Sequence, residues 1–437
     1  MNKRQTYSIQ KDAEAFKTAL IHFFKKESFF FLLDSNHHQD QYANYDWLVA
    51  VGALEKLSPQ SGEAFNSLRS FREEFPDWCF GWLTYDLKNE VEELESLNID
   101  GMQIPVMQFV VPQYVFSCKK GQVELHAYIN DSRVVTDLIN QIVQDPITHH
   151  ATVVKSQFIE ARDEEDTYIK KAHRFLNHIK RGDIYEANFC TEFFAHDAYF
   201  DSIKAYNDLN KISEPPFAAY VRSNEFSLIS ASPERYLQKK GTKIISQPIK
   251  GTAARSGHFV VDESLKEKLQ NDPKERSENV MIVDLVRNDL SRVAQKGSVQ
   301  VEELFGVYTF KQVHQMISTI TCELREEISA VDAIENSFPM GSMTGAPKIS
   351  AMKIIEEQES FKRGLYSGSV GYFTPNDDFD FNVVIRSILY NSNLKYLSFS
   401  VGSALTVAAQ PEKEYQECML KARAMKNVLA LQGFESR

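Results

Sequence analysis

The amino-terminal third of the chain consists of short apolar runs that end at turn-forming residues. Residues 29–33 (FFFLL) are followed by Asp34-Ser35, and the run at 110–116 is followed by Lys119-Lys120-Gly121. Apolar runs of this length, bounded by turn residues, are typical of β-strands, whereas helices generally need about ten residues or more. Residues 1–150 are therefore predicted to form a sheet-rich region.

The remainder of the chain alternates helices with strands. An acidic segment without periodicity at 145–166 is the predicted junction, and a second region is expected over 165–432. Ile169, Ala172, Leu176 and Ile179 recur at three- and four-residue spacing up to Gly182, which predicts an amphipathic helix. Further helices are expected at 275–293, 347–357 and 411–431, and strands at 226–230, 368–373, 381–389 and 396–401. The pattern indicates an α/β (α+β) fold.

Composition excludes several classes of function. The net charge of −11 disfavours nucleic acid and anionic membrane as partners, although a local cationic or metal cluster can still bind a small dicarboxylate. The amino terminus lacks an apolar targeting segment, and no apolar run reaches about 18 residues. The cysteines are odd in number and lack a Cys-x-x-Cys pair, so neither a disulfide framework nor a zinc site is indicated. We expect a soluble cytoplasmic protein; the cysteines are Cys79, Cys118, Cys190, Cys322 and Cys418.

Two acidic pairs lie on predicted helices. Glu275 and Glu278 form one, and Glu414 and Glu417 the other, each spaced so that both carboxylates project from one helix face. Like charges so placed repel, and a hard cation such as Mg²⁺ would relieve the repulsion with oxygen ligands. For either pair alone, a solvated helix face is the favoured interpretation.

Lys250 follows a strand-like segment and precedes Gly251 and Thr252. Glycine at this place would let the backbone approach a ligand closely. If Lys250 were desolvated, its pKa would fall and its neutral amine could act as a nucleophile; otherwise it is a surface residue. The segment 341–348 (GSMTGAPK), which leads into a predicted helix, and Gly402 are two further places where backbone donors could meet an anion.

His314 and Arg386 are polar residues within apolar surroundings. Arginine offers a fork that suits a carboxylate, and histidine can hold or transfer a proton near neutral pH. A hydrogen-bonded core histidine and a buried ion pair of the arginine are the alternatives.

Several segments together resemble the chorismate-utilising enzymes, the family that includes anthranilate synthase and isochorismate synthase. The resemblance covers nearly the whole chain and is strongest over 165–430. It implies two large antiparallel sheets with flanking helices. The segments that carry it are 182–185 (GDIY), 231–235 (ASPER), 278–290 (ENVMIVDLVRNDL), 341–348, 368–373 (GSVGYF), 414–417 (EYQE) and, more loosely, 81–87 (GWLTYDL).

The resemblance also implies a role for each candidate residue. Mg²⁺ would bind the glutamates and one carboxylate of chorismate, and other residues would bind the enolpyruvyl carboxylate, supply hydroxyl or backbone donors, or carry out the chemistry. The metal residues are Glu278 and Glu417 with Glu275 and Glu414; the substrate-binding residues are Arg386, Tyr372, Ser342, Gly402 and Gly251; and the catalytic residues are Lys250, Glu234, His314 and Thr252.

Lysine at position 250 resembles the members that make 4-amino-4-deoxychorismate for 4-aminobenzoate and folate synthesis, whereas anthranilate synthases, the alternative, usually have alanine there. The resemblance implies a covalent adduct of Lys250 with chorismate, with Glu234 as the acid, protonated because its pKa is raised. The sequence contains no Gly-x-Cys-x-Gly segment of a glutaminase, so a separate glutamine amidotransferase subunit is expected to supply ammonia. Glu186, where glutamine is more usual, and Ala404, where glycine is usual, depart from the family pattern.

Overall fold

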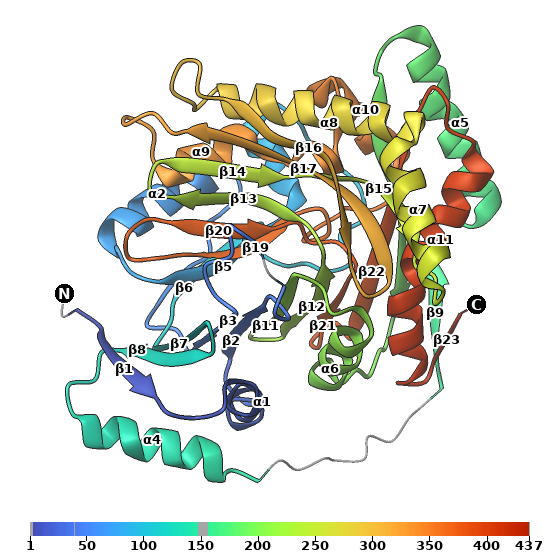
Figure 1. Ribbon diagram of the computed structural model, residues 1–437. Helices are drawn as coiled ribbons and strands as arrows, with labels where there is room; N and C mark the ends of the chain where they lie inside the picture. Colours follow the sequence, from blue (N-terminus) through green and yellow to red (C-terminus); the bar gives the residue numbers. More distant parts are fainter. Residues whose placement is uncertain (1–2, 39, 147–155, 437) are drawn as a thin grey trace.

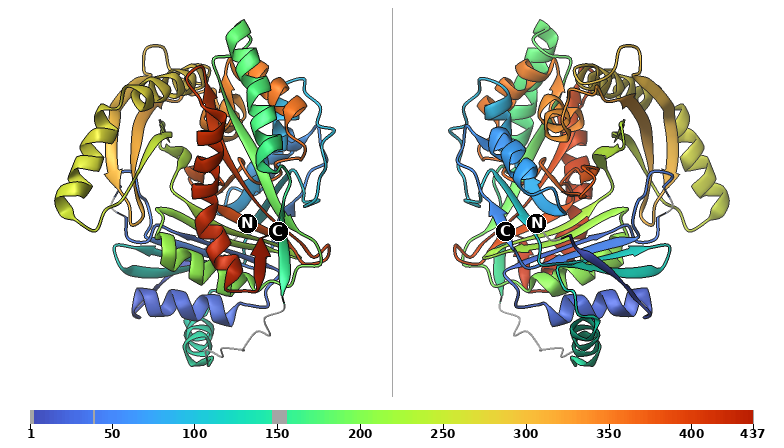
Figure 2. Two further views of the ribbon diagram at one scale, coloured as in Figure 1. Left: turned by 90° about the vertical axis from the view of Figure 1, so that its right-hand side faces the viewer. Right: turned by 90° about the vertical axis from the view of Figure 1, so that its left-hand side faces the viewer.

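The computed structural model describes residues 3–38, 40–146 and 156–436, and its strands form two large sheets that lie face to face between two layers of helices (Figure 1). The two side views show the same layering (Figure 2). The fold expected from the sequence, with two large antiparallel sheets and flanking helices, is confirmed.

The larger sheet has 13 strands within the described chain, and all its neighbours are antiparallel except β9 and β23. β18 (Gly345–Ala346) pairs with β10 off the main path. The order is β1 (Gln5–Ile9), β8 (Gln122–Ala127), β7 (Tyr114–Lys119), β3 (Trp47–Val51), β2 (Phe29–Asp34), β11 (Phe217–Ser223), β12 (Phe226–Ser232), β21 (Ser387–Asn391), β22 (Tyr396–Thr406), β10 (Glu186–Ala195), β9 (Gln157–Ala161) and β23 (Phe434–Ser436).

The smaller sheet has 10 strands in the same described ranges. β16 (Gln300–Thr309) pairs with β17 off the main path. The order is β15 (Ile249–Ala254), β17 (Val313–Glu323), β14 (Lys243–Gln247), β13 (Arg235–Lys240), β20 (Phe379–Asn382), β19 (Ser369–Phe373), β5 (Cys79–Leu83), β6 (Met107–Val111) and β4 (Glu55–Leu57).

Three apolar cores hold the layers together. The core between the sheets contains Phe31, Trp82 and Leu228. A second core lies between the larger sheet and α1 (Ala13–Phe23), α4 (Ser132–Gln144), α5 (Glu165–Arg181), α6 (Ser202–Ser213), α10 (Lys348–Gln358) and α11 (Pro411–Ala430). A third lies between the smaller sheet and α2 (Ala64–Glu74), α8 (Pro273–Ser291) and α9 (Ala330–Ser337). The remaining helices are η1 (Tyr85–Leu87), α3 (Lys88–Val91), α7 (Phe259–Asn271) and η2 (Gly341–Met343).

Both halves of the sequence contribute strands to both sheets. In the larger sheet β2 pairs with β11, and in the smaller sheet β5 pairs with β19. The regions expected at 1–150 and 165–432 therefore share their cores, and the junction marks a place in the sequence rather than a gap between two bodies. The central part of that junction, 147–155, lies outside the described residues.

The four predicted helices are present as α5, α8, α10 and α11, and Gly182 ends α5 with a left-handed φ of 84°. Two strand predictions were wrong in the same way. The run at 381–389 is two strands, β20 and β21, in different sheets, and the run at 110–116 covers parts of β6 and β7, again in different sheets. The breaks fall near Arg386, which has a φ of 52°, and at Pro112, which cannot donate a ladder hydrogen bond.

Among the residues described, none of the helices combines the length and the apolar character needed to cross a bilayer.

Candidate active site

Lys250 extends from β15 into the interior, where its ammonium meets Glu186 at the start of β10. Nζ lies 2.6 Å from Glu186 Oε1, and the two side chains are 10% and 2% exposed. The backbone of Glu186 is fixed on both sides, because it pairs with Thr406 in β22 and with Ala346 in β18. Lys250 is therefore an interior lysine and not the surface residue that sequence alone left possible.

The structure holds Lys250 as an ammonium. Burial by itself lowers the pKa of the amine, but the carboxylates of Glu186, Glu278 and Glu417 together outweigh burial, and the pKa of Lys250 is raised. The neutral amine that desolvation alone would favour is therefore not the favoured form, because these neighbours outweigh burial. Glu186 Oε2 is buried and has no hydrogen-bond partner in the described part of the chain.

Glu234 is buried between β12 and β13, with 4% of its surface exposed. The Ser342 hydroxyl donates a hydrogen bond of 2.7 Å to Glu234 Oε1. Burial raises the pKa of Glu234 to about 7, although Ser342, the Ile249 backbone, Lys250 and Arg386 favour its charged form. The expected rise of this pKa is confirmed.

Arg386 lies in the segment that connects β20 to β21, and its charge interacts with the carboxylate of Glu234. Burial lowers the pKa of Arg386 to about 10, partly opposed by Glu234. Within the described ranges, its guanidinium has neither a hydrogen bond nor an ion pair. An arginine fork without an internal partner is suited to a carboxylate of a ligand.

The four glutamates lie on α8 and α11, which face each other across the site. The Lys274 ammonium lies between the helices, 3.7 Å from Glu278 Oε1 and 3.5 Å from Glu414 Oε1. Lys421 Nζ lies 2.7 Å from Glu417 Oε1. The structure thus brings the two predicted glutamate pairs together, and Lys274 and Lys421 partly balance their negative charge.

The electrostatics of this glutamate group favour an added cation. Burial, with the charge of Glu278 next, raises the pKa of Glu275 to about 7, and burial together with Glu417 raises the pKa of Glu414. In the described chain no three acidic, histidine or cysteine side chains already form a metal-binding group. The oxygen donors nevertheless fit Mg²⁺, which prefers a few carboxylates together with water and substrate oxygens.

The positions of His314 and Thr252 give less support to the catalytic roles predicted for them. The His314 ring is fully buried and bonded on both sides, with Nε2 3.0 Å from Asp262 Oδ1 and Nδ1 3.0 Å from Thr309 Oγ1. Among described residues it has no hydrogen bond or ion pair with Lys250. Thr252 is exposed in β15. The hydrogen-bonded interpretation of His314 is the one observed, and the catalytic roles of both residues stay predictions.

The structure does not bring Tyr372 to Arg386. The Tyr372 ring packs on Phe80, with ring centroids 5.8 Å apart, and lines a cavity together with Arg235. Side chains alternate along β19, and Val370 and Tyr372 both point into the core between the sheets. Tyr372 was thus expected in the substrate site but lies in that core.

The two glycines named as substrate contacts lie at close approaches of the backbone. Gly251 has a φ of 97°, and an added Cβ would lie 3.1 Å from Glu275 Oε2, so β15 passes directly against α8. Gly402 packs on Cys190, and its carbonyl accepts 2.9 Å from Lys421. Ala404 pairs with Asn188 in the regular ladder of β10 and β22, so the extra methyl causes no register shift.

Sequence reasoning missed the buried partners of this site. Glu186 was noted only as a departure from the family pattern. Its pairing with Lys250 could not be predicted, because it depends on a tertiary contact between β10 and β15. Arg363 and Glu359, which contact the Ser342 loop through Asn188 and Met343, were not singled out at all. Both residues follow the end of α10 at Gln358 in irregular chain, so no helical spacing pointed to them.

The family model of the chorismate binding enzymes matches residues 18–427. The chain belongs to the chorismate binding enzymes. Among curated relatives of this chorismate binding enzyme, aminodeoxychorismate synthase component 1 of Bacillus subtilis (strain 168) is 32% identical over 378 residues, or 83% of the chain and 80% of that protein. Anthranilate synthase component 1 3 of Haloarcula marismortui is 31% identical over 370 residues, with 80% and 73% covered.

Some relatives are much longer. The probable chloroplastic aminodeoxychorismate synthase of Oryza sativa subsp. japonica is 39% identical over 285 residues, which is 64% of this chain and 32% of that protein, so the chain spans about a third of its length. Two solved structures share the fold: anthranilate synthase component I of Streptococcus pneumoniae, with a TM-score of 0.77, 23% identity and 89% and 93% coverage, and the Escherichia coli isochorismate synthase MenF, with 0.76, 16% and 98% and 96%.

Proposed function

We propose that this chain is component 1 of an aminodeoxychorismate synthase, which converts chorismate and ammonia to 4-amino-4-deoxychorismate. The observation that carries the proposal is the placement of Lys250, an interior ammonium between Glu186 and the glutamates of α8 and α11. Relatives named aminodeoxychorismate synthase component 1 from B. subtilis and Klebsiella aerogenes support it.

Chorismate carries two carboxylates, and the site offers two places for them. The fork of Arg386, which has no side-chain partner in the described part of the chain, suits the enolpyruvyl carboxylate. Glu275, Glu278, Glu414 and Glu417 would hold Mg²⁺, which would neutralise the other carboxylate when bound. Ser342 supplies a hydroxyl next to the ring, because it already faces Glu234.

The first half of the proposed reaction forms a covalent adduct. Lys250 must lose a proton before it attacks, and Glu186, 2.6 Å away, is the adjacent carboxylate that can accept it. The amine attacks C2 of chorismate, the two conjugated ring double bonds each shift by one position away from C2, and the C4 hydroxyl leaves as water with the proton of Glu234. A carboxyl with a pKa of about 7 can be protonated to donate in this step.

The second half releases the lysine. Ammonia adds at C4, both ring double bonds shift back, and the bond between C2 and the Lys250 nitrogen breaks. The incoming nitrogen gives up a proton, so the sum is chorismate plus ammonia to 4-amino-4-deoxychorismate plus water. Two displacements with allylic shift retain the configuration at C4, which a single displacement would not do. Covalent catalysis divides one difficult step into two easier ones.

Ammonia is proposed to come from a separate glutaminase subunit, in keeping with the "component 1" names of the relatives. The alternative activity is that of anthranilate synthase component I, favoured by the H. marismortui relative. A lysine in the place of Lys250, which resembles the enzymes that aminate C4, argues for the first of the two.

Intact-mass analysis tests the adduct. Protein incubated with chorismate and Mg²⁺ but without ammonia should gain the mass of chorismate less water, and peptide mapping should place the gain on Lys250. Lys250→Ala should gain no mass and lose turnover with ammonium salt. Lys243→Ala is the matched control, because Lys243 is half-buried in β14, the preceding strand along the chain, and pairs with Glu302 instead.

Product analysis separates the two activities. With chorismate, Mg²⁺ and ammonium salt, we expect 4-amino-4-deoxychorismate, which a purified lyase converts to 4-aminobenzoate. Anthranilate as the product would replace the proposal with its alternative, and unchanged turnover in Lys250→Ala would remove the covalent mechanism.

A further inference from the structure

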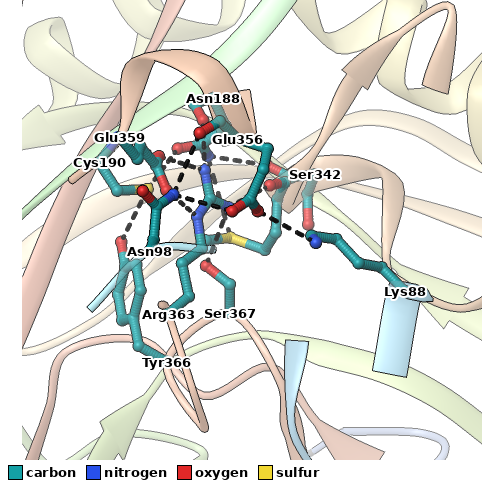
Figure 3. A network of polar contacts seen from close by, with 11 residues as sticks. Lys88, Asn98, Asn188, Cys190, Ser342, Glu356, Glu359, Arg363, Tyr366 and Ser367 are labelled. Atoms are coloured by element: carbon teal, nitrogen blue, oxygen red, sulfur yellow. Dashed lines mark hydrogen bonds and ion pairs between the residues drawn. The ribbon is translucent and has the colours of Figure 1, made fainter. Parts of the chain in front are cut away.

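Arg363 is a fully buried cation whose five N–H donors all have acceptors (Figure 3). Glu359 accepts two of them, at 2.9 Å from Nε and 2.6 Å from Nη2. The Met343 carbonyl accepts at 2.7 Å, the Asn188 carbonyl at 2.8 Å and the Ser367 hydroxyl at 3.4 Å. A buried charge is costly unless its donors are paired in this way. Arg363 therefore holds the groups that accept its hydrogen bonds in fixed positions.

The contacts of Arg363 and Asn188 converge on one loop. Asn188 Nδ2 donates to the Ser342 carbonyl at 3.0 Å, and the Asn188 backbone N–H donates to the Thr344 carbonyl at 2.7 Å. Arg363 binds the Met343 carbonyl between them. Three consecutive carbonyls are thus held by two residues, and Glu359 anchors the same unit to β10 by accepting from the Cys190 N–H at 3.0 Å.

The loop needs this support. Ser342 lies in η2, a turn of three residues, which is too short to hold its own conformation. Its hydroxyl bonds Glu234, so the position of the Ser342 backbone decides whether that bond forms. Displacement of a catalytic contact by about 1 Å can cost on the order of a hundredfold in rate.

We propose that Arg363, Glu359 and Asn188 form a positioning unit that holds Ser342 against Glu234, the acid of the first half-reaction. The inference rests on the proposed function, because it assigns these residues to the departure of the C4 hydroxyl. None of the three touches substrate, and they act through the Ser342 backbone.

A double-mutant cycle tests the unit. Asn188→Ala removes the donor to the Ser342 carbonyl and should lower kcat about tenfold to a hundredfold, with the KM for chorismate changed less than about twofold. In Ser342→Ala, the further change Asn188→Ala should have no added effect, because both act through one contact. Independent, multiplicative effects would overturn the proposal.

The pH profile gives a second readout. The Ser342 hydrogen bond lowers the pKa of Glu234, so its loss should move the alkaline limb of kcat/KM to higher pH, equally in Asn188→Ala and Ser342→Ala. A limb that moves in Ser342→Ala but stays in place in Asn188→Ala contradicts the proposal. Thr191→Val is the matched control on β10, because the Thr191 hydroxyl is buried and has no hydrogen-bond partner among the residues that the structure describes, and it should leave both kcat and the limb unchanged.

Arg363→Lys keeps the proposal testable if Asn188→Ala does not fold. A lysine retains the charge for Glu359 but has three donors in place of five, so it should reproduce the shifted limb at reduced kcat. Wild-type kcat and limb position in folded Arg363→Lys would overturn the proposal. Failure of the unmodified protein to aminate chorismate is a different result, because it removes the proposed function before any variant is compared.

Discussion

Burial acts in opposite senses on the charged residues of this site, and neighbouring charges decide which ones stay charged. Burial raises the pKa of Glu234 to about 7 and lowers that of Arg386 to about 10. Lys250 is also largely enclosed, with 10% of its side chain exposed, yet its pKa is raised because Glu186, Glu278 and Glu417 surround it. A buried site can thus contain both a carboxyl that is readily protonated and an amine that needs a base.

Activity should fall as the pH rises through the pKa of Glu234. The carboxyl must be protonated to release the C4 hydroxyl, and its protonated fraction decreases about tenfold for each pH unit above about 7. The alkaline limb of adduct formation, measured by mass against pH, should therefore begin near pH 7.

Glu234→Gln cannot donate a proton, and it should slow adduct formation by about 10²–10⁴-fold and remove that limb. A variant with the same limb as the unmodified protein would show that another group is the acid.

At the scale of elements, the four helices predicted from the sequence are present, but α1, α2 and α4 lie within a region that was predicted only to be sheet-rich. The spacing of Glu275 with Glu278 and of Glu414 with Glu417 placed both pairs on helix faces, and α8 and α11 do carry them. Strands were harder to predict, since an apolar run carries no mark of which sheet it joins. The run at 381–389 changes sheet at Arg386, whose left-handed φ of 52° has no local sequence signature.

The facing helices should bind Mg²⁺ through their carboxylates. Calorimetric titration with Mg²⁺ should show weaker binding in Glu278→Gln and Glu414→Gln, by at least the roughly tenfold that loss of a supporting group costs at metal sites. Glu412→Gln is the control, because Glu412 is exposed in the first turn of α11 and outside the glutamate group.

The same titration should depend on pH. The pKa of Glu275 is raised to about 7, so Mg²⁺ binding should release protons and weaken as the pH falls below 7. Equal Mg²⁺ affinity in Glu278→Gln, Glu414→Gln and Glu412→Gln would show that the metal binds outside the glutamate group.

At the scale of the whole molecule, the site depends on contacts between distant parts of the chain. Sequence patterns and the family resemblance located Lys250, Glu234 and Arg386. The structure places Lys250 and Arg386 close enough to Glu234 for their charges to affect its pKa. The partners of His314, Asp262 and Thr309, come from α7 and β16 and could not be found by pattern. The side of β19 that Tyr372 faces was equally hidden, because both faces of that strand are buried.

The shared sheets predict that the carboxyl-terminal region cannot fold alone. A fragment of residues 156–436 would leave β11 without β2 and β19 without β5, and would expose apolar surface that now covers Phe31 and Trp82. We expect it to aggregate, and co-expression with residues 1–146 to restore a soluble complex. Thermal unfolding followed by circular dichroism is the measurement, and a cooperative transition of the monomeric fragment alone would contradict the expectation.

The parallel pairing of β23 with β9 affects the tendency of these molecules to associate at high protein concentration. β9 pairs with β10 through only two positions, and without β23 its outer backbone groups would be open to a strand from another molecule. The three residues of β23 occupy that edge, and at the opposite edge of the sheet β1 is a strand of only five residues. Short edge strands of this kind discourage edge-to-edge pairing between sheets of different molecules, so shortening the chain before Phe434 should promote self-association even with the catalytic residues intact.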